Sequence, residues 1–133
     1  MAGTVKYMSP EWRDEAEKRL KSELTPEKMK HITTSMCCIY QNCPDGKQRY
    51  YFVKTENGSL VEISIGDQEP PKAEFILTAD YETFAKLTRG ELSGRAALMG
   101  RKLTLSGNLI KALKLSTVAD RMNKVLSAIP AEY

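Results

Sequence analysis

The sequence predicts a single α+β domain, and three observations support this fold class. The chain has 133 residues and an ordinary globular composition, 41% hydrophobic and 28% charged, which suits one domain. Its hydrophobic spacing changes near residue 35 from the period of a helix to the alternation of strands. After residue 73, strand and helix patterns take turns. Helices first, an antiparallel meander next and mixed elements last are typical of α+β folds.

The opening segment, residues 9–32, predicts two helices. Ser9-Pro10-Glu11 is a helix start, with a capping hydroxyl, a proline at the first helical position and an acid in the first turn. An apolar stripe then recurs at every fourth position, at Trp12, Ala16, Leu20 and Leu24. Thr25-Pro26-Glu27 repeats the start signal, so we expect a short second helix that ends by residue 32.

Residues 35–66 predict a three-stranded antiparallel meander. The turns fall at Pro44-Asp45-Gly46 and at Asn57-Gly58, and an Asn-Gly pair favours a tight hairpin. Val61, Ile63 and Ile65 alternate with polar residues, as in a half-buried strand.

The remaining chain predicts two more strands and three helices. Pro70-Pro71 cannot pair in a sheet, so residues 66–72 are expected to form a crossing loop. The hydrophobic pattern and the capping residues then give the following elements: strand 73–79, helix 80–89, helix 93–99, strand 101–106 and helix 108–129.

The positive charge is unevenly distributed along the chain. Residues 86–124 hold nine Lys/Arg against two acids, a net charge of +7, while the whole chain carries +3. One interpretation is a solvated helical surface; the other is attraction to an anionic group such as a lipid headgroup, a coenzyme A phosphate or nucleic acid.

The sequence shows no convergent catalytic or metal-binding set. Cys37 and Cys38 are adjacent on a predicted strand and point to opposite faces, and His31 is too distant from them for a zinc-ligand spacing. The three thiols, including Cys43, are expected to be reduced and mostly buried. We therefore predict a protein that is not an enzyme and that needs neither metal nor cofactor. No segment approaches the ~18 apolar residues of a membrane span and no secretory leader is visible, so a cytoplasmic location is expected.

Two familiar nucleotide or nucleic-acid patterns fail on spacing. Five residues separate Gly94 from Gly100, whereas a Walker loop has four between its glycines. The segment then leads through Lys102 into a strand, whereas a Walker loop leads into a helix. The aromatic run 48–55 lacks the glycines of RNA-recognition strands, and the basic excess lies far from it. We expect no nucleic-acid partner.

Residues 73–115, AEFILTADYETFAKLTRGELSGRAALMGRKLTLSGNLIKALKL, resemble the sterol carrier protein type 2 family. The shared pattern is a strand, a capped helix with an inward Phe84, then Gly90-Glu91-Leu92 and a helix of small residues. Gly100–Leu103, Ser106–Asn108 and Ala112–Leu115 follow in the family's order. With the preceding meander, the resemblance covers about residues 35–116.

The resemblance implies a five-stranded mixed sheet, with helices over one face and an apolar tunnel between the two layers. It implies a module that binds or transfers an acyl chain, a sterol-like lipid or an isoprenoid. The expected tunnel lining is Phe75, Leu77, Phe84, Leu98, Met99, Leu103, Leu105, Leu109, Ile110 and Leu113. The expected contacts to an anionic headgroup or membrane are Arg95, Arg101, Lys102, Lys111 and Lys114.

The residues alone support the lipid interpretation through the segment Leu109–Leu115. It is apolar on more than one side, and that is more apolar surface than one packing face needs. Two alternatives remain open. One is an accessory or dimerisation domain of a lipid or quinone system, which predicts a homodimer. The other is an enzyme acting on acyl-coenzyme A.

Overall fold

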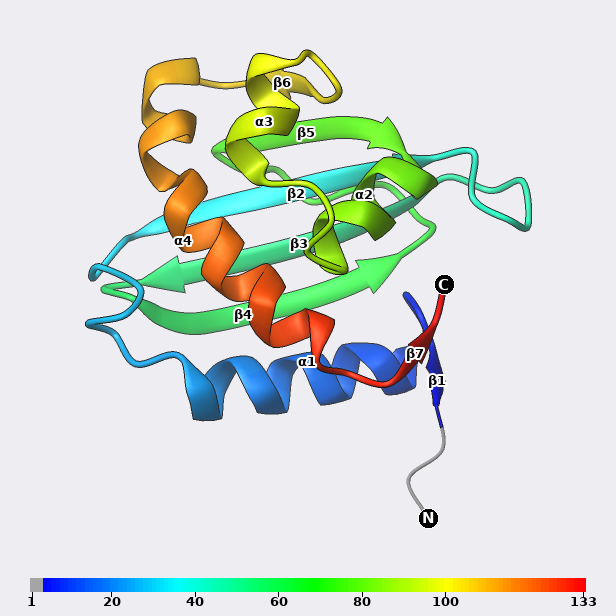
Figure 1. Ribbon diagram of the computed structural model, residues 1–133, viewed down its shortest axis with the longest axis horizontal. Helices are drawn as coiled ribbons and strands as arrows, with labels where there is room; N and C mark the ends of the chain where they lie inside the picture. Colours follow the sequence, from blue (N-terminus) through cyan, green and yellow to red (C-terminus); the bar gives the residue numbers. More distant parts are fainter. Residues whose placement is uncertain (1–3) are drawn as a thin grey trace.

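The computed structural model describes residues 4–133, and its elements form one sheet with a layer of helices (Figure 1). In chain order they are β1 (Val5–Lys6), α1 (Pro10–Glu23), β2 (Thr34–Gln41), β3 (Arg49–Glu56), β4 (Ser59–Gly66), β5 (Phe75–Asp80), α2 (Tyr81–Thr88), α3 (Gly94–Met99), β6 (Thr104–Ser106), α4 (Leu109–Ser127) and β7 (Ala131–Glu132). The predicted α+β class is confirmed.

The main sheet has five strands in the order β4-β3-β2-β5-β6. β2, at its centre, pairs antiparallel with β3 and parallel with β5, while the other pairs are antiparallel. The register places Cys38 of β2 between Tyr51 of β3 and Leu77 of β5. A crossover must join β4 to β5, because these strands are not neighbours; the Pro70-Pro71 loop makes this connection.

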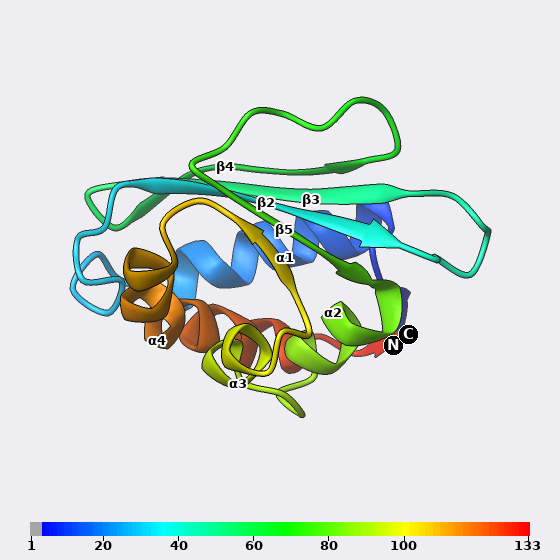
Figure 2. The same ribbon diagram turned by 90° about the horizontal axis from the view of Figure 1, so that it is seen from above.

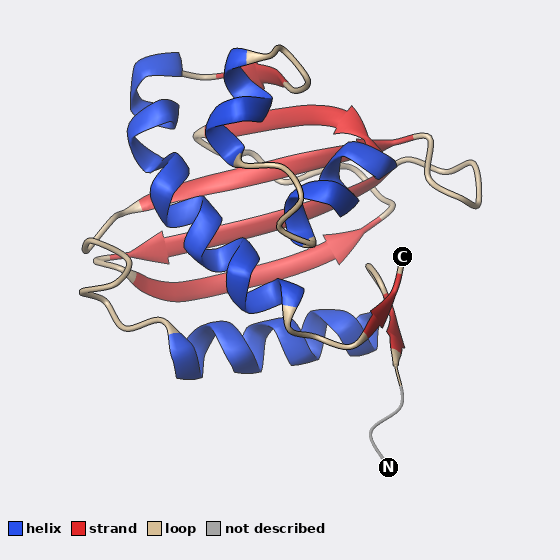
Figure 3. Ribbon diagram, viewed as in Figure 1, coloured by secondary structure: helices blue, strands red, loops and turns tan. Residues whose placement is uncertain are grey.

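The two faces of the sheet are covered differently. α2, α3 and α4 lie on one face, and the loop from β4 to β5 runs over the other (Figure 2). Beneath that loop, Cys37, Tyr50 and Phe52 form a small buried cluster against which Ala73 packs. The larger core lies between the sheet and the helices. In Figure 3, α4 crosses the strands diagonally over this core.

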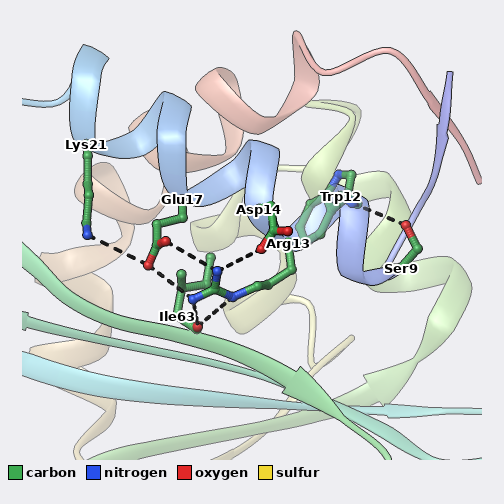
Figure 4. Close-up of polar contacts among 7 residues, drawn as sticks. All are labelled: Ser9, Trp12, Arg13, Asp14, Glu17, Lys21 and Ile63. Atoms are coloured by element: carbon green, nitrogen blue, oxygen red, sulfur yellow. Dashed lines mark hydrogen bonds and ion pairs between the residues drawn. The ribbon is translucent and has the colours of Figure 1, made fainter. Parts of the chain in front are cut away.

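Helix α1 packs beside the edge strand β4 through the predicted stripe. Trp12 and Ala16 are 0% exposed, and the Ser9 hydroxyl accepts a hydrogen bond from the Trp12 amide at 3.2 Å. The guanidinium of Arg13 donates to the carbonyl of Ile63 in β4 at 2.8 and 3.0 Å (Figure 4). Glu17 in turn accepts from Arg13, at 3.1 and 3.2 Å. The guanidinium of Arg13 therefore links helix α1 to strand β4 through charge-assisted hydrogen bonds.

The predicted second helix in residues 25–32 is wrong, since this segment is a series of turns. The backbone of Lys30 and His31 is left-handed, with φ of 54° and 50°, which ends any helical run. Gly58, in the β3–β4 hairpin, packs against the segment, and its amide donates to the Ile32 carbonyl at 2.8 Å. A Cβ at Gly58 would lie 2.6 Å from the carbonyl oxygen of Pro26, so only glycine fits this contact.

A second, two-stranded sheet joins the two ends of the described chain and was not predicted. β1 and β7 pair in parallel, with hydrogen bonds from Val5 N to Pro130 O at 3.0 Å and from Tyr7 N to Glu132 O at 2.8 Å. This pairing holds the Tyr7 side chain in the core. Its hydroxyl is 2.6 Å from the Tyr40 hydroxyl and 2.7 Å from Thr88 Oγ1.

Candidate functional site

An apolar cavity of ≈130 Å³ lies between the sheet and the helices. Its floor consists of alternate residues of adjacent strands, because every second side chain of a strand points to the same face. From β2 these are Thr34, Met36, Cys38 and Tyr40, and from β3 they are Tyr51, Val53 and Thr55. Phe75 and Leu77 of β5 and Leu105 of β6 complete the floor.

Helices α2, α3 and α4 form the roof of the cavity. α2 contributes Phe84, Leu87 and Thr88, and α3 contributes Gly94 and Leu98. The part supplied by α4 follows helical spacing and includes Ala112, Leu115, Ser116, Ala119, Met122, Asn123 and Leu126. Gly94 and Leu98 are four residues apart, so they lie on the same face of α3, and this face points toward the cavity.

The wall of the cavity is uncharged. It includes no Lys, Arg, His, Asp or Glu from residues 4–133. Burial raises the pKa of the Tyr40 and Tyr51 hydroxyls and of the Cys38 thiol, so these groups stay protonated at neutral pH. A ligand inside would meet an apolar surface with a few neutral hydrogen-bonding groups.

Most of those polar groups already have protein partners. Tyr40 and Thr88 bond to Tyr7, and the Ser116 hydroxyl donates to the Leu113 carbonyl at 2.7 Å. Among the oxygen- and nitrogen-bearing side chains of the wall, two have no hydrogen bond within the described part of the chain, the phenol of Tyr51 and the amide of Asn123. These two groups are available to a polar atom of a ligand.

The two ends of the cavity differ in enclosure. At the α2 end, Tyr40 and Phe84 stack with ring centroids 4.3 Å apart and are buried. At the other end the wall includes the half-buried Leu98, Leu105 and Ala112, from α3, β6 and α4. We therefore take the α3–β6–α4 end as the side of entry.

Six of the ten residues expected to line a tunnel are in the wall of the cavity: Phe75, Leu77, Phe84, Leu98, Leu103 and Leu105. The other four, Met99, Leu109, Ile110 and Leu113, are not. Met99, Leu109 and Ile110 are instead 61%, 49% and 68% exposed, and Leu113 is half-buried. The face of α4 that turns to the sheet is the one through Ala112, Leu115 and Ala119, and Ile110 lies on the opposite side of the helix.

The prediction missed most of the floor of the cavity. Met36, Cys38, Tyr51 and Val53 come from the meander, where the alternation of inward positions was visible in the sequence. The missing information was the register of β2 against β5. Met36 pairs with Phe75 and Cys38 with Leu77, so these residues of β2 share the cavity face of β5.

The basic residues singled out from the sequence are all exposed on α3, α4 and the turn before β6. Lys111 is paired with Glu74 and its ammonium lies 5.9 Å from the centroid of the Phe75 ring. Arg95, Arg101, Lys102 and Lys114 form no ion pair with any of residues 4–133. Four cations on α3, α4 and the turn before β6 are therefore without an ion-pair partner in the described residues.

The cysteines are all free and buried. Cys38 faces the cavity and Cys37 the opposite cluster, as strand alternation predicts. In the described residues no His, Cys, Asp or Glu side chains gather in a group able to hold a metal ion. Within the same range, every helix is too short or too polar to cross a bilayer.

The described residues thus form a mixed sheet roofed by helices, with an uncharged apolar cavity between the two layers. Comparison with known proteins then gives the family. Residues 14–120 match the SCP-2 sterol transfer family, and the chain belongs to it. The resemblance identified in the sequence is confirmed.

Among curated proteins, hydroxysteroid dehydrogenase-like protein 2 of Danio rerio is 38% identical over 78 residues, 58% of this chain. The chain spans about a fifth of the length of the curated relatives it matches, 18% of this one.

Among solved structures, a crystal structure of sterol carrier protein 2 has a TM-score of 0.79 at 20% identity, covering 93% of this chain and 99% of that one. Palmitated SCP2L2 from Aedes aegypti has a TM-score of 0.57 at 19% identity, covering 84% of this chain and 94% of that one. At such identities these likenesses establish the fold.

Proposed function

We propose that this protein is a lipid-binding or lipid-transfer module that holds an acyl chain or a sterol-like or isoprenoid lipid in the cavity, without catalysis and without a cofactor. The observation that carries the proposal is the uncharged apolar wall beneath a helical roof, in a member of a sterol transfer family. A structural neighbour described as palmitated supports the same use of the fold.

The driving force is burial of hydrocarbon. Each methylene transferred from water contributes about 0.8 kcal/mol, so a dozen methylenes contribute roughly 10 kcal/mol before the cost of ordering the chain. The resting cavity, ≈130 Å³, is smaller than the ~300–1,000 Å³ of typical ligand pockets. A long chain therefore enters by displacing the half-buried roof at Leu98 and Ala112.

The polar end of the ligand has two kinds of partner. Arg95, Arg101, Lys102, Lys111 and Lys114 attract an anionic headgroup that stays at the entry side. Tyr51 and Asn123 offer neutral hydrogen bonds to a hydroxyl or carbonyl inside the cavity.

A second candidate is an accessory domain beside a metabolic enzyme, as a homodimer or within a larger assembly. The observation that favours it is the match to a hydroxysteroid dehydrogenase-like protein of which this chain spans 18%. Under this alternative the cavity is not loaded with lipid, and light scattering shows a dimer.

The test uses two neighbouring residues on opposite faces of β5. Leu77 lines the cavity and Ile76 does not. Wild-type protein should release lipid on denaturing extraction, detected by mass spectrometry, and the delipidated protein should bind a fluorescent fatty acid at micromolar concentration. Leu77→Gln should weaken binding at least tenfold and Ile76→Gln should not. Absence of extracted lipid together with absence of probe binding would refute the proposal.

A further inference from the structure

Three of the four exposed large hydrophobic side chains in residues 4–133 belong to one short stretch of chain. Met99 ends α3, and Leu109 and Ile110 begin α4, with exposed fractions of 61%, 49% and 68%. The fourth, Val61 at 48%, lies on β4 at the far edge of the sheet. We call Met99, Leu109 and Ile110 the apolar tip. α3 ends and α4 begins at the end of the molecule marked by β6 (Figure 1).

The unpaired cations accompany the apolar tip. Arg95 is four residues before Met99 and shares its face of α3, and Lys114 is four residues after Ile110 on the same face of α4. Arg101 and Lys102 occupy the turn between α3 and β6. None of the four has an acidic partner in the part of the chain that the structure describes. Exposed apolar side chains together with nearby unpaired cations are the composition of a surface that enters the headgroup layer of a membrane.

We propose that the apolar tip docks on an anionic lipid bilayer, with Met99, Leu109 and Ile110 in the headgroup–acyl boundary and Arg95, Arg101, Lys102 and Lys114 on the lipid phosphates. The half-buried entry residues Leu98 and Ala112 are one and two residues from Met99 and Ile110 on the same two helices, so docking brings this end of the cavity close to the bilayer. The docking itself is independent of the proposed function; only its use in loading the cavity rests on that function.

The charges favour a bilayer over a second copy of this chain. A two-fold dimer through the tip would place the same four cations of each copy near those of the other, and none of these cations has an ion-pair partner among residues 4–133 to offset the repulsion. An anionic membrane instead supplies the opposite charge at the same place as an apolar layer.

The experiment measures co-sedimentation of delipidated protein with vesicles of phosphatidylcholine, alone or mixed with phosphatidylserine. Wild type should prefer the anionic vesicles and dissociate as salt rises. Met99→Gln/Ile110→Gln should weaken this binding about tenfold through lost apolar contact. Arg101→Gln/Lys102→Gln should weaken it about fivefold for each charge removed. The control is Val61→Gln, which alters an exposed apolar residue (48%) away from the tip and should bind as wild type does.

Equal vesicle binding by wild type and Met99→Gln/Ile110→Gln would overturn the proposal, and so would an equal loss in Val61→Gln. Light scattering that shows a dimer dissolved by Met99→Gln/Ile110→Gln, with no vesicle binding, would assign the tip to self-association. Binding of a fluorescent fatty acid in solution is measured on every variant. If wild type binds vesicles but releases no lipid on extraction and binds no fatty acid, docking stands and the proposed function fails.

Discussion

Replacing Ala112 and Ala119 by leucine fills the cavity from its roof. Both alanines lie on the face of α4 that turns to the sheet, and both line the cavity. In a solid interior such substitutions overpack and cost about 1–3 kcal/mol each. Over an empty space the added methyl groups instead find room and apolar neighbours, so the sign of the change in stability reports whether the space exists.

The size of the effect follows from the volume. At about 24 cal/mol per Å³, complete filling of the ≈130 Å³ cavity would stabilise the protein by about 3 kcal/mol. Two leucines that fill part of it should add about 1–2 kcal/mol after the small helix-propensity cost. Affinity for a fatty acid should fall at least tenfold, because the ligand and the new side chains compete for one space.

The assay is urea unfolding of delipidated protein, followed by far-UV circular dichroism, together with titration of a fluorescent fatty acid. Ala85→Leu is the matched control, since Ala85 is a helical alanine that is 0% exposed and does not line the cavity. It should lose about 1–3 kcal/mol. If Ala112→Leu/Ala119→Leu loses stability to the same extent as Ala85→Leu, the centre of the molecule is solid and the reasoning is refuted.

Three further predictions concern contacts that hold the fold together, each checked by urea unfolding. Tyr7→Phe should lower the free energy of unfolding by about 2 kcal/mol, because the buried hydroxyls of Tyr40 and Thr88 lose a partner. In the control, Tyr50→Phe, the lost hydroxyl bonds only to the exposed Gln68, so the decrease should be less than about 1 kcal/mol. Arg13→Lys should lose about 1–2 kcal/mol, since a lysine cannot bond both the β4 carbonyl and a carboxylate as the guanidinium does. The hydrogen bond from the Lys111 ammonium lowers the pKa of the Glu74 carboxyl in the folded protein. The pair therefore stabilises the fold fully at a pH above the unfolded pKa of about 4.3, and this stabilisation is lost as the pH falls through the lower folded pKa. Glu74→Gln should remove that slope, by less than about 1 kcal/mol because the pair is partly exposed, and an unchanged pH profile would contradict it.

The sequence predicted the elements that carry strong local signals. Trp12, Ala16 and Leu20 of the predicted stripe are buried on α1, while Leu24 lies just past the helix and is half-buried. The Asn57-Gly58 turn has both residues left-handed, with φ of 49° and 81°. Two features lacked such signals. β1 and β7 have two residues each, too few for a period to be visible. Residues 25–32 carry a good helix start, but tertiary packing against Gly58 places Lys30 and His31 in a conformation that neither residue type announces.

The site was predicted in part for a similar reason. Phe75 and Leu77 were placed correctly because a strand has only two faces, and its inward set follows from one buried member. Leu109 and Ile110 were assigned to the cavity because their segment is apolar on more than one side, and in such a helix the sequence alone does not tell which side meets the sheet. The exposure of these two residues is the feature from which the membrane-docking proposal was drawn.

The parallel pairing of β1 with β7 has a mechanical consequence. Because the strands run the same way, pulling the first described residues away from the last loads their hydrogen bonds along the strand direction, in shear and simultaneously. Tension would also reach the Tyr7 ring, which is 4.5 Å from that of Tyr133 and is anchored to Tyr40 and Thr88. If the protein is stretched between its two ends, the β1–β7 pairing would be the first part to resist the force.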